Sequence, residues 1–188
     1  MKRIIVLFFL FSIGKLQAQF SESSTGTLKI GAGYTHDFPG LNGYTVAGEY
    51  TFSLIRQIQG GIGVKHAGMT GYPRTATVHE YTKANTLDFN LYWVPFQSET
   101  QLARIGLGYS FSFYDIKRAY PLTTSTSDGK SVITWPSTIT KGRTTGINLI
   151  AEYEFKIPNS PITVGLRGAL YKAYNRTYFI GPMIGYQL

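Results

Sequence analysis

Few residues of this chain could carry out catalysis. The chain contains no cysteine and only three histidines, His36, His66 and His79. A histidine can activate a serine hydroxyl as a nucleophile when the two groups are within hydrogen-bond reach. The polar residues that could lie near the histidines are Ser110, Ser112, Asp115 and Glu80. No spacing links these residues as nucleophile, base and orienting group, so the sequence predicts no enzyme.

Metal and cofactor sites are not expected either. No HxH or HxxxH spacing joins the three histidines, and the lack of cysteine removes thiolate ligands and disulfides. The chain has no phosphate-binding loop, dinucleotide fingerprint or calcium loop. We therefore predict that it binds no cofactor and no metal.

Eight charged residues follow a regular pattern, because each alternates along the chain with apolar residues. Four are basic and four are acidic: Lys29, Glu49, Lys65, Asp88, Arg104, Glu152, Glu154 and Arg167. A Lys or Arg that faces lipid at the bilayer midplane costs about 2–4 kcal/mol, so these groups should face an interior. Unpaired buried ions are costly, which predicts a packed core of paired charges. A narrow gated ion path and a general acid/base pair formed by Glu152 and Glu154 are the alternatives.

Eight alternating segments would position these charges. In the first, Leu28 and Ile30 on one face alternate with Lys29 and Gly31 on the other. The segments cover residues 27–36, 44–54, 58–66, 87–93, 103–113, 147–155, 162–170 and 178–188. Backbone groups in lipid must be satisfied internally, and no apolar run after the first 18 residues is long enough for a spanning helix. The pattern predicts an all-β fold, an eight-stranded antiparallel up-and-down transmembrane β-barrel.

The connections between the segments alternate in length. Bacterial barrels have short periplasmic turns and longer outer loops, and the two long connections here, 68–84 and 116–142, fall on the same side. In the longer one, Asp128-Gly129 predicts a hairpin between residues 123–127 and 131–135. We expect the fifth and sixth segments to continue there as a ribbon above the membrane. Pro182 cannot donate a ladder hydrogen bond, which predicts a bulge or weak point in the last segment.

The first residues have the features of an export signal. Lys2 and Arg3 precede the apolar run 4–13, and Leu16-Gln17-Ala18 resembles a signal-peptidase site. The run has about ten residues, whereas a helix needs roughly 20 to span a bilayer. We predict a cleavable signal peptide at 1–18 and a barrel domain at 19–188.

Aromatic residues near the segment ends and the final alternating residues, Ile184, Tyr186 and Leu188, carry a family resemblance. The chain resembles the small outer-membrane β-barrel proteins of the OmpA/OmpX type over nearly all of its mature length. The resemblance implies a bacterial outer-membrane location and insertion by the barrel-assembly machinery, which recognises such a terminal strand. The chain departs from the pattern at Leu188, where those proteins usually carry an aromatic residue. Some small barrels are lipid A acyltransferases or deacylases, so this activity remains an alternative.

After the predicted signal peptide the chain has 15 basic and 10 acidic residues, and this basic excess is concentrated in the outer connections. Contact candidates there are Arg74, Lys117, Arg118, Tyr120, Lys130, Trp135, Lys141 and Arg143. Basic loops at an outer leaflet would attract the phosphates and carboxylates of lipopolysaccharide. A protein partner in a larger outer-membrane complex is the other candidate. Nucleic acid is not expected, because the chain is exported and its charge is dispersed.

These features predict a structural or interaction role at the cell envelope, as an accessory subunit or through surface contact. The alternatives are a lipid A-modifying enzyme, a narrow ion channel and a soluble lipocalin-like carrier. A carrier would turn its apolar residues inward and its charges outward, so the direction of exposure separates it from a membrane barrel.

Overall fold

Ten strands make up the regular structure of the chain. The computed structural model describes residues 26–55, 57–72, 78–119, 123–127, 130–134 and 137–188. The strands are β1 (Thr27–Asp37), β2 (Asn42–Ile55), β3 (Ile58–Gly71), β4 (Glu80–Gln97), β5 (Gln101–Ala119), β6 (Thr123–Ser127), β7 (Lys130–Thr134), β8 (Ser137–Lys156), β9 (Ile162–Lys172) and β10 (Arg176–Gln187). Within these residues no helix is long and apolar enough to cross a membrane.

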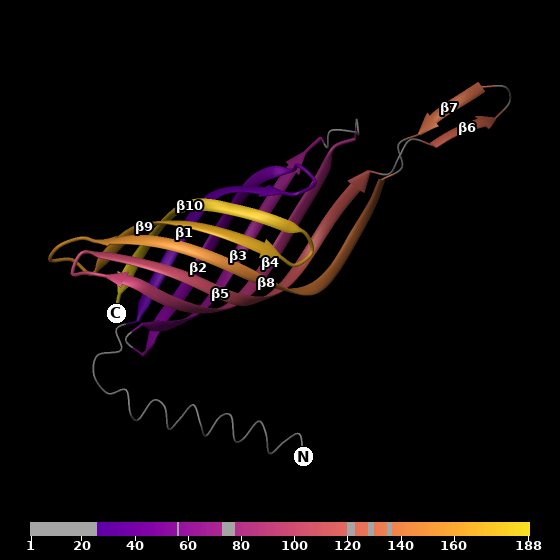
Figure 1. The fold of residues 1–188 in the computed structure, drawn as a ribbon. Coiled ribbons are helices and arrows are strands. Elements are labelled where there is room, and N and C mark those ends of the chain that lie inside the picture. Colours follow the sequence, from indigo (N-terminus) through magenta and orange to yellow (C-terminus); the bar gives the residue numbers. More distant parts are fainter. Residues whose placement is uncertain (1–25, 56, 73–77, 120–122, 128–129, 135–136) are drawn as a thin grey trace, which may run out of the picture.

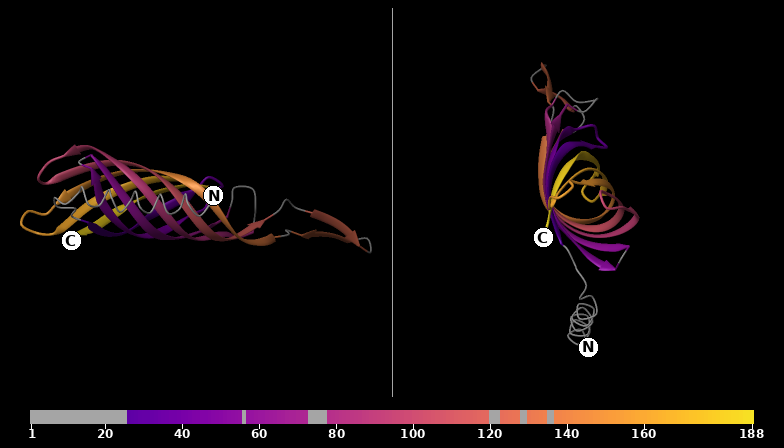
Figure 2. Two further views of the ribbon diagram at one scale, coloured as in Figure 1. Left: turned by 90° about the horizontal axis from the view of Figure 1, so that it is seen from below. Right: turned by 90° about the vertical axis from the view of Figure 1, so that its left-hand side faces the viewer.

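Eight of the strands close into a barrel, in the order β1-β10-β9-β8-β5-β4-β3-β2, and β6 and β7 pair only with each other (Figure 1). All neighbours are antiparallel, and β1 closes the ring by pairing with β10 from Thr27↔Gln187 to Asp37↔Thr177. The strands are strongly tilted against the barrel axis (Figure 2). A closed ring leaves no strand edge unpaired in the lipid, so the predicted fold class is confirmed.

The exposure of the side chains follows the alternation of the sequence. Leu107 and Ile30 are 67% and 64% exposed on the outer wall, whereas Lys29 and Glu152 are 0% and 4% exposed. Successive residues of a strand point to opposite faces, so a segment that alternates must expose one set and enclose the other. The alternative of a soluble lipocalin-like carrier is wrong, because its apolar residues would be enclosed.

Several strands extend further than the alternation predicts at the end of the barrel that has the long connections. The predicted connection 68–84 is shorter, because β3 continues to Gly71 and β4 begins at Glu80. The connection 116–142 is largely strand, since β5 and β8 stay paired to Ala119↔Ser137. The continuing ribbon is as predicted, and the hairpin of β6 and β7 matches its prediction to within one residue. The alternation did not predict these strand ends, because Thr, Gly and charged residues take the place of alternating apolar residues above the membrane.

The last strand has no bulge at Pro182, but the alternative prediction of a weak point fits, because the β1–β10 pairing is interrupted there, between Gly31↔Met183 and Tyr34↔Ile180. The β9–β10 register is unbroken through Pro182↔Leu166, and the β1–β10 ladder keeps its register on either side of this position. Two other places show register shifts, between Ser53 and Ile55 and between Trp93 and Phe96. Both shifts lie next to the short turns, where a local irregularity does not disturb the rest of the wall.

Candidate functional site

The barrel interior contains a network of ion pairs centred on Glu152. One carboxylate oxygen of Glu152 accepts from Lys29 Nζ at 2.5 Å and from Arg104 Nη2 at 2.8 Å. The other accepts from Arg167 Nε at 2.7 Å. Strand register produces part of this arrangement. Glu152 of β8 is directly opposite Arg104 of β5 on one side and Arg167 of β9 on the other.

Two further carboxylates complete this network. Glu154 pairs with Lys29 at 2.6 Å and with Arg104. Glu49 pairs with Arg167 and accepts hydrogen bonds from the Tyr92 hydroxyl and from Asn90 Nδ2, both at 2.6 Å. Each carboxylate therefore faces at least one cation, as a buried ion requires.

Lys65 and Asp88 form a second ion pair nearer the ribbon end, with Lys65 Nζ 3.1 Å from Asp88 Oδ2. Ser110 donates a hydrogen bond to Asp88 Oδ1 at 2.6 Å. The Lys65 ammonium also lies 3.0 Å from the centre of the Tyr171 ring, a cation–π contact. The structure thus encloses all eight predicted interior charges and pairs every one of them.

Tyr92 is an interior residue to which the sequence analysis gave no role. Its side chain is fully buried, and it fills space that glycines leave open on both neighbouring strands. A methyl group added at Gly61 or Gly106 would lie 2.9 Å or 2.5 Å from the Tyr92 ring. Tyr92 is directly opposite Gly106 on β5 and two residues along the register from Gly61 on β3, and the signal in the sequence was an inward aromatic residue beside inward glycines.

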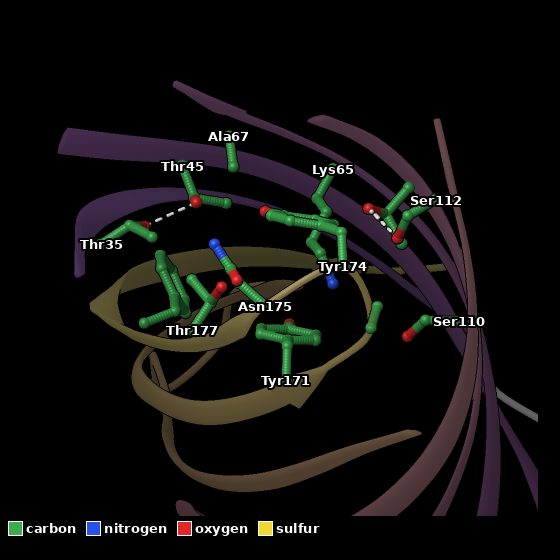
Figure 3. Close-up of a pocket in the computed structure, with 13 residues that line it drawn as sticks. Thr35, Thr45, Lys65, Ala67, Ser110, Ser112, Tyr171, Tyr174, Asn175 and Thr177 are labelled. Carbon is green, nitrogen blue, oxygen red and sulfur yellow. Dashed lines mark hydrogen bonds between the residues drawn. The ribbon is translucent and has the colours of Figure 1, made fainter. Parts of the chain in front are cut away.

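The bore closes between this network and the ribbon end. Only a cavity of about 10 Å³ remains there, lined by hydroxyl groups, by Lys65 and by the rings of Tyr171 and Tyr174 (Figure 3). Hydrogen bonds join Thr35 to Thr45 at 2.6 Å and Thr86 to Ser112 at 2.9 Å across its wall. Such a volume holds about one water molecule, so side chains nearly fill the bore at this level.

A further charged group closes the ribbon end of the bore. Arg118, predicted as an outer contact residue, instead donates to Glu80 at 2.8 Å and to Asp37 at 3.4 Å. Asn175 also donates to Asp37, at 3.2 Å. Beside this group, burial raises the pKa of Tyr174 to about 12, so its phenol stays protonated. Arg118 does not point toward the predicted contact surface. The inward–outward alternation of side chains on β5 continues beyond the membrane, and it directs this side chain inward.

The candidate catalytic residues lie on opposite sides of the wall. His36 and His66 are on the outward register and bond to Asn42 and Asn85, both at 2.8 Å. His79 bonds to Thr70 at 2.6 Å. Ser110 and Ser112 are buried in the bore. Among the described residues no histidine therefore faces a serine, and no group of three His, Asp or Glu side chains is placed to hold a metal ion.

Four of the remaining contact candidates, Lys117, Lys130, Lys141 and Arg143, belong to the ribbon. Lys141 is exposed and lies 3.7 Å from Asp115, Arg143 is exposed, and Lys117 is half-buried. Lys130 begins β7. Arg74, Tyr120 and Trp135 lie outside the described residues, as does the predicted signal peptide.

Besides the edges of the short β6–β7 hairpin, the ribbon has a longer unpaired backbone edge on β8. β8 pairs with β5 along its whole length, from Ser137 to Phe155. Its pairing with β9 begins only at Ile147. Among the described residues, the segment of β8 from 137 to 146 therefore has a paired strand on one side only, although Gly146 at its lower end lies against the backbone of Lys172 and Ala173, and we call this segment the free edge.

Comparison with solved structures relates this arrangement to known proteins. Neisserial surface protein A has a TM-score of 0.60 at 8% identity, and the match covers 88% of this chain and 98% of that one. The N-terminal β-barrel domain of Pseudomonas aeruginosa OprF matches with a TM-score of 0.51 at 11% identity, covering 88% and 100%. This chain has the fold of the small outer-membrane β-barrels. Ail, the attachment invasion locus protein of Yersinia pestis, matches with a TM-score of 0.50 at 11% identity, covering 89% and 100%.

No protein-family model matches the sequence, and no curated protein matches it either. The outer-membrane barrel fold and the exposed apolar wall together place the chain in the bacterial outer membrane. The ribbon end is then the outer end, because long connections lie outside the cell in such barrels.

Proposed function

We propose that this outer-membrane barrel is a non-catalytic interaction protein that binds a protein partner through its outer ribbon. The observation that carries the proposal is the free edge of β8. Among the described residues, the ten residues 137–146 of this strand pair on one side only, beyond the end of the β8–β9 ladder. Unpaired backbone groups on an exposed edge are a template for adding a strand from another chain.

The chemistry of the free edge fits this role. Thr138, Thr140 and Ile139 are exposed, and residues of this kind favour extended backbone. Lys141 and Arg143 add positive charge, which would favour a partner strand with acidic side chains. The partner could be a host surface protein or another subunit of an outer-membrane complex, and both would use the same edge.

Cross-linking at the free edge tests the proposal. The chain has no cysteine, so Thr140→Cys introduces a unique attachment point for a short cross-linker on intact cells. Ser98→Cys, in the turn at the other end of the barrel, is the matched control. We expect a discrete product from Thr140→Cys only. Adding Ile139→Lys should abolish the product, because a lysine on an edge discourages strand addition. A product that survives Ile139→Lys, or no product at all, would contradict the proposal.

Contact with lipopolysaccharide is a second candidate, supported by exposed basic residues near the outer rim. Arg143, Lys172 and Arg176 are exposed, and none of them forms an ion pair among the described residues. A structure of Ail, with a TM-score of 0.52 at 11% identity, is a complex with the heparin analogue sucrose octasulfate. A shift in the gel mobility of the purified protein on addition of lipopolysaccharide would test this candidate. The shift should weaken as salt is added, because salt screens such attraction.

Recognition by the barrel-assembly machinery is the third interaction that we propose. Ile184, Tyr186 and Leu188 all face outward in the last strand and are more than half exposed, at 55%, 53% and 67%. An alternating exposed strand of this kind is what such machinery would bind before the barrel closes. Slower insertion of a Tyr186→Ser variant, followed in cells by the appearance of the folded form, would test this step.

A further inference from the structure

A groove lies in the lipid-facing wall at the outer ends of β8, β9 and β10. It has a volume of about 210 Å³ and its apolar lining includes Ile147, Leu149, Leu170 and Tyr178. It forms because neighbouring strands of the wall end at different levels here. The β8–β9 ladder ends at Ile147↔Lys172, while β8 continues upward with β5 alone.

Two basic residues line the outer end of the groove. Lys172 and Arg176 are directly opposite each other as the last pair of the β9–β10 hairpin, and both are exposed. Like charges directly opposite each other destabilise a strand pair. No carboxylate of the described residues lies within ion-pair distance of either one. An anion placed between them would relieve this repulsion.

We propose that this groove binds lipid A, with one acyl chain against Leu149 and Leu170 and a phosphate between Lys172 and Arg176. The choice of ligand follows from position and charge. The apolar part of the groove faces lipid, and the basic pair lies at the outer end of the wall, where the phosphates of outer-leaflet lipid A are found. The inference deepens the second candidate function above, because it replaces diffuse attraction to the rim by one defined site.

Native mass spectrometry of the folded barrel with added lipid A tests the site. The test variant is Lys172→Gln with Arg176→Gln. The control is Lys83→Gln with Lys156→Gln, which removes the same charge from two exposed positions outside the proposed contact surfaces. Because the test variant loses the charge-assisted contacts to the phosphate, it should bind lipid A about tenfold more weakly or worse. The control should change binding by no more than about twofold.

A second variant tests the apolar part without altering charge. Leu170→Trp should fill the groove and displace the acyl chain, lowering lipid A binding while leaving the basic pair in place. Reduced mobility on unheated gels would verify that each variant is folded. Equal weakening by both charge variants would leave only diffuse attraction and overturn the site. Equal binding of phosphatidylglycerol would overturn the choice of lipid A. The cross-linking at Thr140 is independent of these outcomes.

Discussion

At the scale of single residues, Glu152 joins the largest number of interior charges. It is the only carboxylate that bonds to Lys29, Arg104 and Arg167 together among the described residues. Removing one partner of a buried ion pair leaves the others uncompensated. The ion pairs therefore hold one another in place, and their value to the barrel depends on all members being present.

Glu152→Gln should destabilise the folded barrel by about 3–5 kcal/mol, because three buried cations lose one carboxylate. The free energy of unfolding can be measured by urea titration of barrels refolded into lipid vesicles. Asp115→Asn is the control, since its pair with Lys141 at 3.7 Å is exposed, and it should cost less than about 1 kcal/mol.

The double variant Glu152→Gln with Lys29→Met gives an independent check. It removes one charge of each sign, so the loss should be smaller than the sum of the two single losses. Additive losses would mean that Lys29 and Glu152 do not interact as the 2.5 Å contact indicates.

At the scale of the elements, the seam between β1 and β10 depends on glycine. A methyl group added at Gly181 would lie 2.6 Å from the Gly33 Cα atom, and that neighbour is backbone and cannot turn aside. The two strands are the first and last of the barrel, so this contact is made only when the ring closes. The glycines allow the close approach because they have no Cβ atom.

Gly181→Ala should weaken the closing seam by about 1–3 kcal/mol, the usual range for overpacking. Gly168→Ala is the matched control, because a methyl group there would meet nothing within 4 Å. Hydrogen exchange of β1 and β10 amides, measured in detergent micelles, should rise in Gly181→Ala and stay unchanged in Gly168→Ala. Equal exchange in both variants would show that the seam tolerates a side chain.

At the scale of the whole molecule, the barrel is a filled cylinder with a ribbon at one end. Its interior charges are paired, the cavity beside Lys65 and Tyr171 is about 10 Å³, and Arg118, Glu80 and Asp37 cover the outer end. An eight-stranded barrel has an interior only just wide enough for side chains. These features favour a rigid base for the ribbon over a path for ions.

The purified barrel should show no discrete conductance in planar bilayers, because side chains nearly fill the bore beside Lys65 and Tyr171. A large porin inserted under the same conditions is the positive control. Stepwise openings whose size changes in Arg104→Ala would revive the ion-channel alternative, since Arg104 lies in the bore.

Much of this protein was determined by the sequence alone. The strand count, the fold class and the inward register of the eight charges all follow from period-two alternation, because neighbouring side chains on a strand must face opposite sides. Even the ribbon could be predicted, from an Asp-Gly turn in the middle of a long connection. These are local properties, and local order along the chain is what a sequence displays directly.

Only the tertiary structure decided which charges meet. Lys29 and Glu152 are 123 residues apart, and their contact exists because the closed ring brings β1 and β8 to the same bore. The same holds for the inward turn of Arg118, for the free edge and for the groove beside Lys172 and Arg176. Each depends on the lengths and stagger of neighbouring strands, which backbone pairing sets and side-chain alternation does not reveal.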